Sequence, residues 1–129
     1  VCNHKCEDAC SRGEVDEPIS IMRLKRFVSD WALAHPDEID IPQPEVEPTG
    51  KRVAVIGSGP AGLTCAQDLV ALGHQVTVFE ALPVPGGMMR VGIPAYRMPN
   101  DLVQCEIDDI LALGVELKLN HRVDDAWGR

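Results

Sequence analysis

The sequence has no long apolar run, no excess of positive charge and no initiator methionine. No stretch approaches the roughly 20 consecutive apolar residues that a transmembrane helix needs, so we expect no membrane span. The formal net charge is −8, which argues against a nucleic-acid partner, because such binding depends on a basic face that displaces counterions. The chain begins at Val1 beside a cysteine cluster and has no secretory signal, so we expect a segment of a longer, cytoplasmic protein.

Cysteine is used sparingly and unevenly. Five cysteines are present, an odd number, and no two of them form a C-x-x-C pair, which excludes the redox disulfide of the disulfide reductases. Without a secretory signal, this pattern favours a reducing compartment, where metal binding or burial is favoured over a disulfide framework. Cys2, Cys6 and Cys10 form a cluster at intervals of four residues. Cys65 and Cys105 stand alone in apolar helical patterns, and we expect them to be small buried hydrophobic residues.

The first 50 residues divide into a helical stretch and a connector. Residues 1–35 are predicted to be helical, with Pro18 in a first helical turn, where its missing N–H would be unpaired anyway. The apolar residues at helical spacing are Ile21, Leu24, Val28 and Trp31, with Phe27 widening the stripe. Residues 36–50 hold four prolines and five acidic residues, which predicts an extended, semi-rigid linker and a domain boundary.

Residues 51–129 alternate between strand and helix patterns. Short apolar runs predict strands at 53–56, 76–79 and 115–119, and helical spacing predicts helices at 63–72 and 101–113. Gly73 and Gly114 follow the two helices and can close them in the left-handed conformation. This order predicts an α/β fold with a parallel, Rossmann-type sheet and right-handed crossovers.

The strongest motif is VAVIGSGPAGL, in which a G-x-G-x-x-G sequence directly follows a predicted strand and directly opens a predicted helix. Gly57 permits the tight turn, Gly59 leaves room for a pyrophosphate, and Gly62 lets the helix pack closely on the sheet. The other residues of the loop are Ser58, Pro60 and Ala61. The helix N-terminus offers free N–H groups and a partial positive charge to the phosphates.

Glu80 ends the second predicted strand, at about the distance of 20 residues at which dinucleotide-binding motifs carry an acidic residue. A carboxylate there can accept both hydroxyls of an adenosine ribose and repels a 2′-phosphate, which disfavours NADP in this site. The alternative is a glycine loop with an incidental surface glutamate. Spacing alone does not decide between FAD and NAD. Gly86 and Gly87 indicate backbone close to a ligand, and a plain turn after the strand is the competing interpretation.

Three segments together resemble the glutamate synthase small-subunit family, which includes the N-terminal part of dihydropyrimidine dehydrogenase. They are CNHKCEDACSRGEVDEPISIMRLKRFVSD, GSGPAGL and FEALPVPGGMMRVGIPAYRMP, and the resemblance covers Cys2 to about Val123. Many oxidoreductases share the glycine motif, whereas its combination with the cysteine motif is far more specific. The resemblance implies an all-helical, ferredoxin-like iron–sulfur domain, followed by an FAD domain into which an NAD(P)H domain is inserted.

The same resemblance implies roles for individual residues. It makes Gly57 to Gly62 the pyrophosphate loop and Glu80 the ribose ligand. The further residues that it assigns to FAD are Gly87, Met88 and Arg97, with the backbone of Val123 reaching the adenine. The alternatives are that Met88 fills a gap in the core and that Arg97 is a solvated surface residue.

The resemblance also implies a division of the chain. Residues 1–35 would end the iron–sulfur domain, residues 36–50 would be the linker, and residues 51–129 would begin the FAD-binding domain. Cys2, Cys6 and Cys10 would be ligands of two 4Fe–4S clusters completed by cysteines upstream. Lys25 stands where one relative has a Glu or Gln ligand, and a lysine offers only donors. The alternative is three thiols without metal, which we expect for this chain alone.

These expectations converge on an NAD(P)H-dependent flavoprotein oxidoreductase that passes electrons between nicotinamide, FAD and 4Fe–4S clusters. NAD(P)H would bind in a domain outside this chain, and the chain alone would be inactive. One alternative is a non-catalytic electron-transfer subunit that docks a partner redox subunit or domain and carries FAD as a relay. Another is an NAD-binding dehydrogenase domain. No general acid, base or nucleophile is assigned in this segment.

Overall fold

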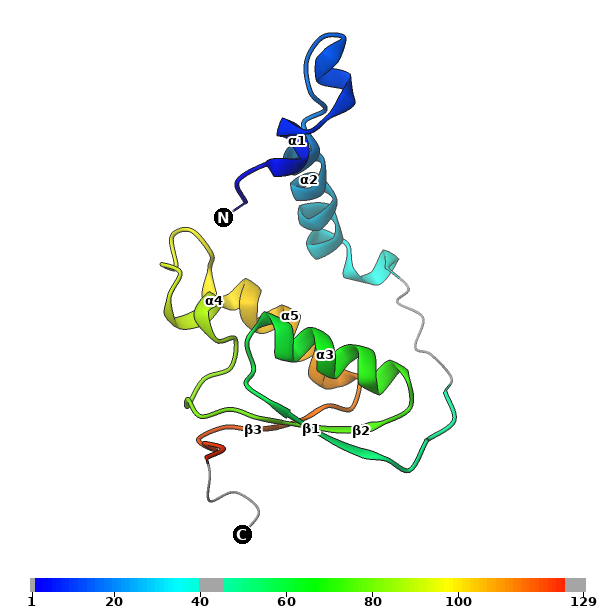
Figure 1. Cartoon of the computed structure of the whole chain (residues 1–129), viewed down its shortest axis with the longest axis vertical. Helices are drawn as coiled ribbons and strands as arrows, with labels where there is room; N and C mark the ends of the chain where they lie inside the picture. Colours follow the sequence, from blue (N-terminus) through cyan, green and yellow to red (C-terminus); the bar gives the residue numbers. More distant parts are fainter. Residues whose placement is uncertain (1, 40–45, 125–129) are drawn as a thin grey trace. The chain divides into compact units, whose positions relative to one another are not determined.

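The described residues of the computed structural model, 2–39 and 46–124, fall into two units (Figure 1). The first unit is Val1–Pro42 and the second is Gln43–Arg129. The first is helical, and the second holds a three-stranded sheet. In neither described stretch is any helix both long and apolar enough to cross a membrane.

The first unit is built from short helical turns and one longer helix. Its elements are α1 (Lys5–Asp8), the 3-10 turn η1 (Ser11–Glu14), α2 (Ile21–Ala34) and the 3-10 turn η2 (Pro36–Glu38). Glu7 joins α1 to α2, because its Oε1 accepts the backbone N–H of Met22 at 2.8 Å. Ser20, the N-cap of α2, makes no side-chain cap bond. An acceptor for this helix end therefore comes from another element of the unit.

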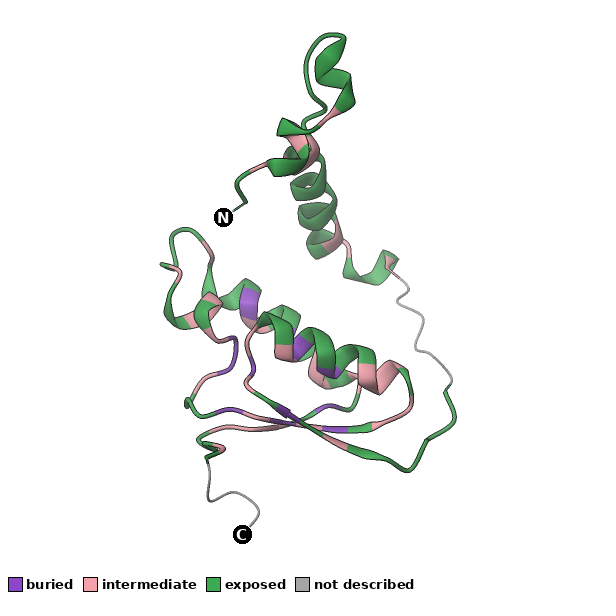
Figure 2. Ribbon diagram, in the orientation of Figure 1, coloured by how far each residue is buried: buried purple, intermediate pink, exposed green. Residues whose placement is uncertain are grey.

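Helix α2 starts later than the sequence predicts. Pro18 lies two residues before the N-cap Ser20, so its placement in the first turn is wrong. The Ile19 N–H lowers the pKa of the Cys10 thiol, and the helix itself begins at Ile21. The apolar stripe of α2 is present but uncovered, since its members Leu24, Phe27, Val28 and Trp31 are all exposed (Figure 2).

The second unit is α/β with a parallel sheet, as predicted. Its elements are β1 (Arg52–Ile56), α3 (Pro60–Ala71), β2 (Gln75–Phe79), α4 (Met88–Val91), α5 (Asn100–Ala112) and β3 (Glu116–Lys118). The strands lie in the order β1-β2-β3, and Val55 pairs with Val78, which pairs with Leu117. Gly73 and Gly114 follow the two long helices at φ values of +83° and +101°, which confirms the predicted helix ends.

The core lies between the sheet and the two long helices. Figure 1 shows α3 and α5 on the same side of the sheet, as two successive right-handed crossovers in one direction require. The buried side chains are Val55, Ala66, Val76, Val78 and Val115, with a second cluster of Leu63, Val103 and Ile107. Burial of one such valine or leucine side chain contributes about 1.5–3 kcal/mol.

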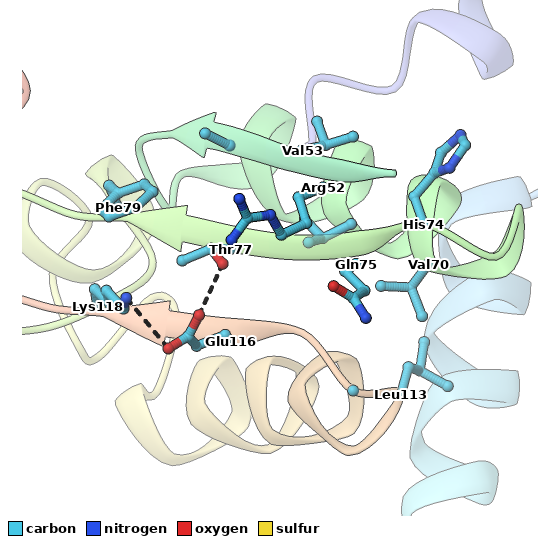
Figure 3. A pocket seen from close by; sticks show the side chains of 13 residues that line it. Arg52, Val53, Val70, His74, Gln75, Thr77, Phe79, Leu113, Glu116 and Lys118 are labelled. Carbon is cyan, nitrogen blue, oxygen red and sulfur yellow. Dashed lines mark hydrogen bonds and ion pairs between the residues drawn. The ribbon is translucent and has the colours of Figure 1, made fainter. Parts of the chain in front are cut away.

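No helix of the described part of the second unit covers the other face of the sheet (Figure 1), and Figure 3 shows side chains that lie on it. Burial alternates along β2, so every second side chain faces away from the core. On this open face the Thr77 hydroxyl donates to Glu116 Oε2 at 2.8 Å, and Lys118 Nζ lies 3.3 Å from Glu116 Oε1. Parallel sheets are ordinarily covered on both faces. In the described part of the second unit, only one face is covered.

The expectation that Cys65 and Cys105 are buried is wrong, because both are exposed. Ala66 of helix α3 and Ile107 of helix α5 are buried in the core. At 3.6 residues per turn, a neighbour one or two positions away points about 100° or 200° elsewhere on the helix. The apolar sequence around each cysteine therefore did not determine which face it occupies.

Candidate dinucleotide-binding site

A tight loop joins the carboxyl end of β1 to the N-terminus of α3. Gly57 begins the loop at φ +92°, a left-handed conformation that favours glycine, and its N–H donates to Phe79 O at 2.8 Å. Gly59 is the N-cap of α3, and Pro60 is its first residue. The N–H groups of this first turn have no acceptor within the helix and carry its partial positive charge. An anion is favoured at this helix end.

The surroundings of the motif glycines separate a folding role from a binding role. A Cβ at Gly62 would lie 2.0 Å from Gly57 O, so α3 packs on the loop only because residue 62 has no side chain. The close packing predicted for Gly62 is confirmed. A Cβ at Gly59 would meet nothing within 4 Å. The space beside Gly59, at the end of a helix, therefore fits a pyrophosphate.

Glu80 directly follows β2 and is almost completely buried, with 6% of its surface exposed. Its Oε2 accepts the Ser58 N–H at 2.9 Å and the Ser58 hydroxyl at 2.6 Å, and its Oε1 accepts the Leu82 N–H at 2.8 Å. Burial alone would raise the pKa of the Glu80 carboxyl. Hydrogen bonds from the Ser58 hydroxyl and from the N–H groups of Leu82, Ser58 and Ala81 outweigh it and hold this pKa below its ordinary value. Glu80 is therefore ionised at neutral pH.

These contacts change what is expected of Glu80. It is not the incidental surface glutamate of the alternative interpretation, because it is buried against the loop. A carboxylate offers about four lone-pair sites, and the donors of Ser58, Leu82 and Ala81 already occupy most of this capacity. Glu80 therefore holds the loop in place, and only its remaining capacity is open to a ligand. This role of Ser58 was not predicted from the sequence, although a hydroxyl between two motif glycines is a signal for it.

The Gly86–Gly87 turn packs directly against the same loop. The Gly86 N–H donates to Ser58 O at 3.0 Å and lies 3.3 Å from Ser58 Oγ. Gly87 has φ +54°, and a Cβ there would lie 2.8 Å from Gly59 Cα. The absence of a side chain at Gly87 therefore permits the contact between turn and loop.

Met88 and Arg97 follow this turn. Met88 is the first residue of α4 and is 69% exposed, so the interpretation that it fills a gap in the core is wrong. Its side chain lies over Gly92, where a Cβ would come within 2.3 Å of Met88 Cε. Arg97 is exposed, and its backbone N–H donates to Pro94 O at 2.8 Å. Both side chains are reachable from solvent.

Val123 lies beyond β3, where the chain stays attached to the end of β2. The Glu80 N–H donates to Lys118 O at 2.8 Å, and the His121 N–H donates to Glu80 O at 2.7 Å. Asn120 has φ +56° between these two contacts. Val123 is half-buried and follows two residues after His121. The backbone contacts thus hold this segment at the carboxyl end of the sheet, which is also the end at which the glycine loop begins.

The three clustered cysteines are not gathered into one site. Cys2 and Cys6 are exposed and Cys10 is half-buried. Among residues 2–39 and 46–124, no group of three Cys, His, Asp or Glu side chains is placed to hold a metal ion. The N–H groups of Ile19 and Arg12 hold the pKa of the Cys10 thiol below its ordinary value, against a smaller opposing effect of burial. The surroundings of Cys10 therefore favour its thiolate.

A family comparison matches residues 55–100 to an NAD(P)-binding Rossmann-like domain. The matched range contains the glycine loop, Glu80 and the Gly86–Gly87 turn. It therefore includes every segment that meets at Ser58.

Longer relatives match both units of the chain. Over 95% of its length, the chain is 44% identical to the NADP(+)-dependent formate dehydrogenase subunit beta of Moorella thermoacetica. It is 43% identical over 92% of its length to the NAD-dependent dihydropyrimidine dehydrogenase subunit PreT of Salmonella typhimurium, and 37% identical over 95% to the NADH glutamate synthase of Schizosaccharomyces pombe. The chain spans 20%, 28% and 6% of these relatives, respectively.

Proposed function

Since this chain matches a glutamate synthase small-subunit-like family of oxidoreductases, we propose that it is a segment of a longer NAD(P)H-dependent flavoprotein whose FAD is held by residues 57–62. The observation that carries the proposal is the free space beside Gly59, at the N-terminus of a 12-residue helix and the carboxyl end of a parallel strand. The pyrophosphate of a dinucleotide is bound by this combination of a glycine turn and a helix N-terminus.

The residues around this space take distinct roles in the proposal. The loop from Gly57 to Gly62 encloses the pyrophosphate, and the first N–H groups of α3 neutralise part of its charge. Glu80 accepts a ribose hydroxyl with the capacity that Ser58 and Leu82 leave open. The remaining residues proposed to line FAD are Gly87, Met88 and Arg97, with the backbone of Val123 toward the adenine. The contact of Gly87 with Gly59 supports its place in this set.

FAD, when bound, supplies the redox chemistry: it accepts a hydride equivalent from the nicotinamide and releases electrons onward. The residues of this chain bind the adenosine and pyrophosphate half and orient it. The ionised Glu80 also sets selectivity, because it would repel the 2′-phosphate of an NADP molecule in this loop.

For the first unit, we propose that Cys2, Cys6 and Cys10 belong to a helical iron–sulfur domain whose other ligands lie outside the described residues. Their spacing and the N–H groups that stabilise a thiolate at Cys10 support this, because hydrogen bonds to cluster sulfurs are common in such domains. The described residues do not assemble a complete ligand set, so no electron-transfer step is derived through a cluster.

A second candidate is NAD in the same loop. The family description of residues 55–100 favours it, and so does the nicotinamide cofactor in the name of each relative. A third possibility, a docking subunit that carries FAD only as a relay, draws support from the exposed apolar stripe of α2.

The test is to purify the longer protein, record its visible spectrum, and identify the cofactor released by acid. We expect FAD, bleached anaerobically by NADH or NADPH and able to pass electrons to a dye. A flavin that nicotinamide does not reduce would favour the relay. A preparation without flavin, whose loop binds NAD more tightly than FAD in an equilibrium titration, would assign the loop to NAD.

A further inference from the structure

Three segments that lie apart in the sequence meet at one buried hydroxyl. Ser58 Oγ donates to Glu80 Oε2 at 2.6 Å and accepts the N–H of Gly86 at 3.3 Å. These partners are 22 and 28 residues away along the chain. One side chain therefore links the glycine loop, the end of β2 and the Gly86–Gly87 turn.

Water is excluded from this junction. Ser58 has 0% of its surface exposed and Glu80 has 6%. A donor removed from the carboxylate would therefore not be replaced by solvent, and an under-satisfied buried charge is costly. The backbone bonds from Ser58 N–H to Glu80 and from Gly86 N–H to Ser58 O do not need the hydroxyl. Loss of the Ser58 hydroxyl would thus weaken the junction, while these backbone hydrogen bonds keep the loop folded.

The turn held at this junction contacts Gly59, the residue beside which the candidate pyrophosphate space lies. A Cβ at Gly87 would lie 2.8 Å from Gly59 Cα, whereas beside Gly59 itself there is free space. A shift of the turn would therefore change the shape of that space. A site that is formed for only a fraction of the time binds more weakly in proportion, because the apparent dissociation constant rises as the competent fraction falls.

We propose that Ser58 is a positioning residue whose hydroxyl holds the Gly86–Gly87 turn against the glycine loop and keeps the pyrophosphate site formed before a ligand binds. This inference rests on the proposed dinucleotide function and adds a residue to it. Ser58 acts through Glu80 and Gly86 and does not act on the reacting part of the cofactor. The ADP half of the cofactor is therefore the part whose binding depends on the hydroxyl.

The test variant is Ser58→Ala, which deletes Oγ and introduces no larger side chain. The matched control is Thr77→Val, which deletes a hydroxyl that also donates to a carboxylate, Glu116 Oε2 at 2.8 Å, but on the open face of the sheet. In the longer protein freed of cofactor, amide hydrogen exchange is measured at Gly86 and at the core residue Val78. The dissociation constant of ADP is measured by calorimetry.

For Ser58→Ala we expect exchange at Gly86 to be about tenfold faster and ADP binding to be about tenfold weaker, as for a lost hydrogen bond to a buried charge. Exchange at Val78 should stay at the wild-type rate, since a general loss of stability would accelerate it too. Thr77→Val should match the wild type in all three readouts.

A folded Ser58→Ala protein with wild-type exchange at Gly86 and wild-type ADP affinity would overturn the proposal. If that variant does not fold, Ser58→Cys retains a weaker donor; faster exchange than wild type at Gly86 then supports the link, and an unchanged rate rejects it. If the wild type binds neither ADP nor FAD while Ser58→Ala still accelerates exchange at Gly86, the link stands and the dinucleotide function is wrong.

Discussion

The two units carry motifs of similar regularity but differ in what holds them. In the second unit, glycines at positions 57, 59 and 62 sit in a loop fastened by Glu80 and by the Gly86–Gly87 turn, over a core of buried apolar side chains. In the first unit, Cys6 lies in α1 while Cys2 and Cys10 lie outside its helices, and those helices include no buried residue. Regularly spaced motif residues thus form a site only where tertiary contacts hold them in place.

The first unit depends on polar links in place of a core. Glu7 caps α2 through the Met22 N–H, and Arg12 forms an ion pair with Asp16. A single cap is worth about 0.5–2 kcal/mol, less than the burial of a few apolar side chains. The apolar stripe of α2 and the three thiols remain accessible to solvent. A partner that covers the stripe, or a metal cluster bound by the thiols, would therefore stabilise this unit.

The largest predicted effect comes from Gly62→Ala. The added Cβ would lie 2.0 Å from Gly57 O, so the backbone of the loop or of α3 must shift. We expect a loss of more than about 3 kcal/mol in the free energy of unfolding of the second unit. The matched control is Gly59→Ala, which meets nothing within 4 Å and has an unstrained φ of −71°. Chemical denaturation of both variants checks this, and equal stability would contradict the separation of folding and binding glycines.

Next in size is the contrast between two valines. Val78→Ala removes a side chain with 0% exposure from the core, and we expect a destabilisation of about 1.5–3 kcal/mol. Val28→Ala removes one that is 62% exposed on α2, and its effect should stay within about 0.5 kcal/mol. A large effect of Val28→Ala in denaturant melts of the chain would mean that the stripe is already covered.

Glu80→Gln should lower the free energy of unfolding of the second unit by about 1–3 kcal/mol at neutral pH. The carboxylate accepts hydrogen bonds at both of its oxygens, whereas an amide has only one oxygen. The folded-state pKa of Glu80 is depressed, so its contribution is present above the ordinary value of about 4.3 and is lost as pH falls through the folded-state pKa. The stability curves of wild type and variant should therefore converge as the pH falls below the ordinary carboxyl pKa and through the folded-state pKa. Parallel curves would show that Glu80 makes no ionised contact.

The smallest effect is expected for Glu7→Ala. The variant loses the acceptor of the Met22 N–H, so the first turn of α2 should fray at a cost of about 1 kcal/mol. Amide exchange would report this at residues 21–24, while the second unit keeps its wild-type exchange. A change confined to the second unit would contradict the assignment.

Much of the second unit was predictable because its signals are local. Alternating apolar strands, helical spacing and a glycine after each long helix predicted the parallel α/β arrangement, and the close packing at Gly62 followed from the motif. The family resemblance rested on quoted segments from both units, and relatives that align over more than nine-tenths of the chain confirm it.

What was missed depends on contacts between distant residues. The bonds from Ser58 to Glu80 and Gly86 span 22 and 28 residues, which no local period encodes. The exposure of Cys65 depends on which side of α3 meets the sheet, a matter of a 100° rotation per residue. Helix α2 begins at Ile21, after Pro18, and its first turn is capped by Glu7, which lies 15 residues before Met22 in the chain.

The central claim is that the space beside Gly59 holds the pyrophosphate of FAD, and Gly59→Val in the longer protein tests it most directly. The new side chain starts where nothing lies within 4 Å, on a backbone whose φ of −71° suits any residue. We predict that the wild type purifies with stoichiometric FAD, and that the variant has no flavin but the same unfolding midpoint as wild type freed of its FAD. A folded variant that retains FAD at the wild-type ratio would contradict the claim.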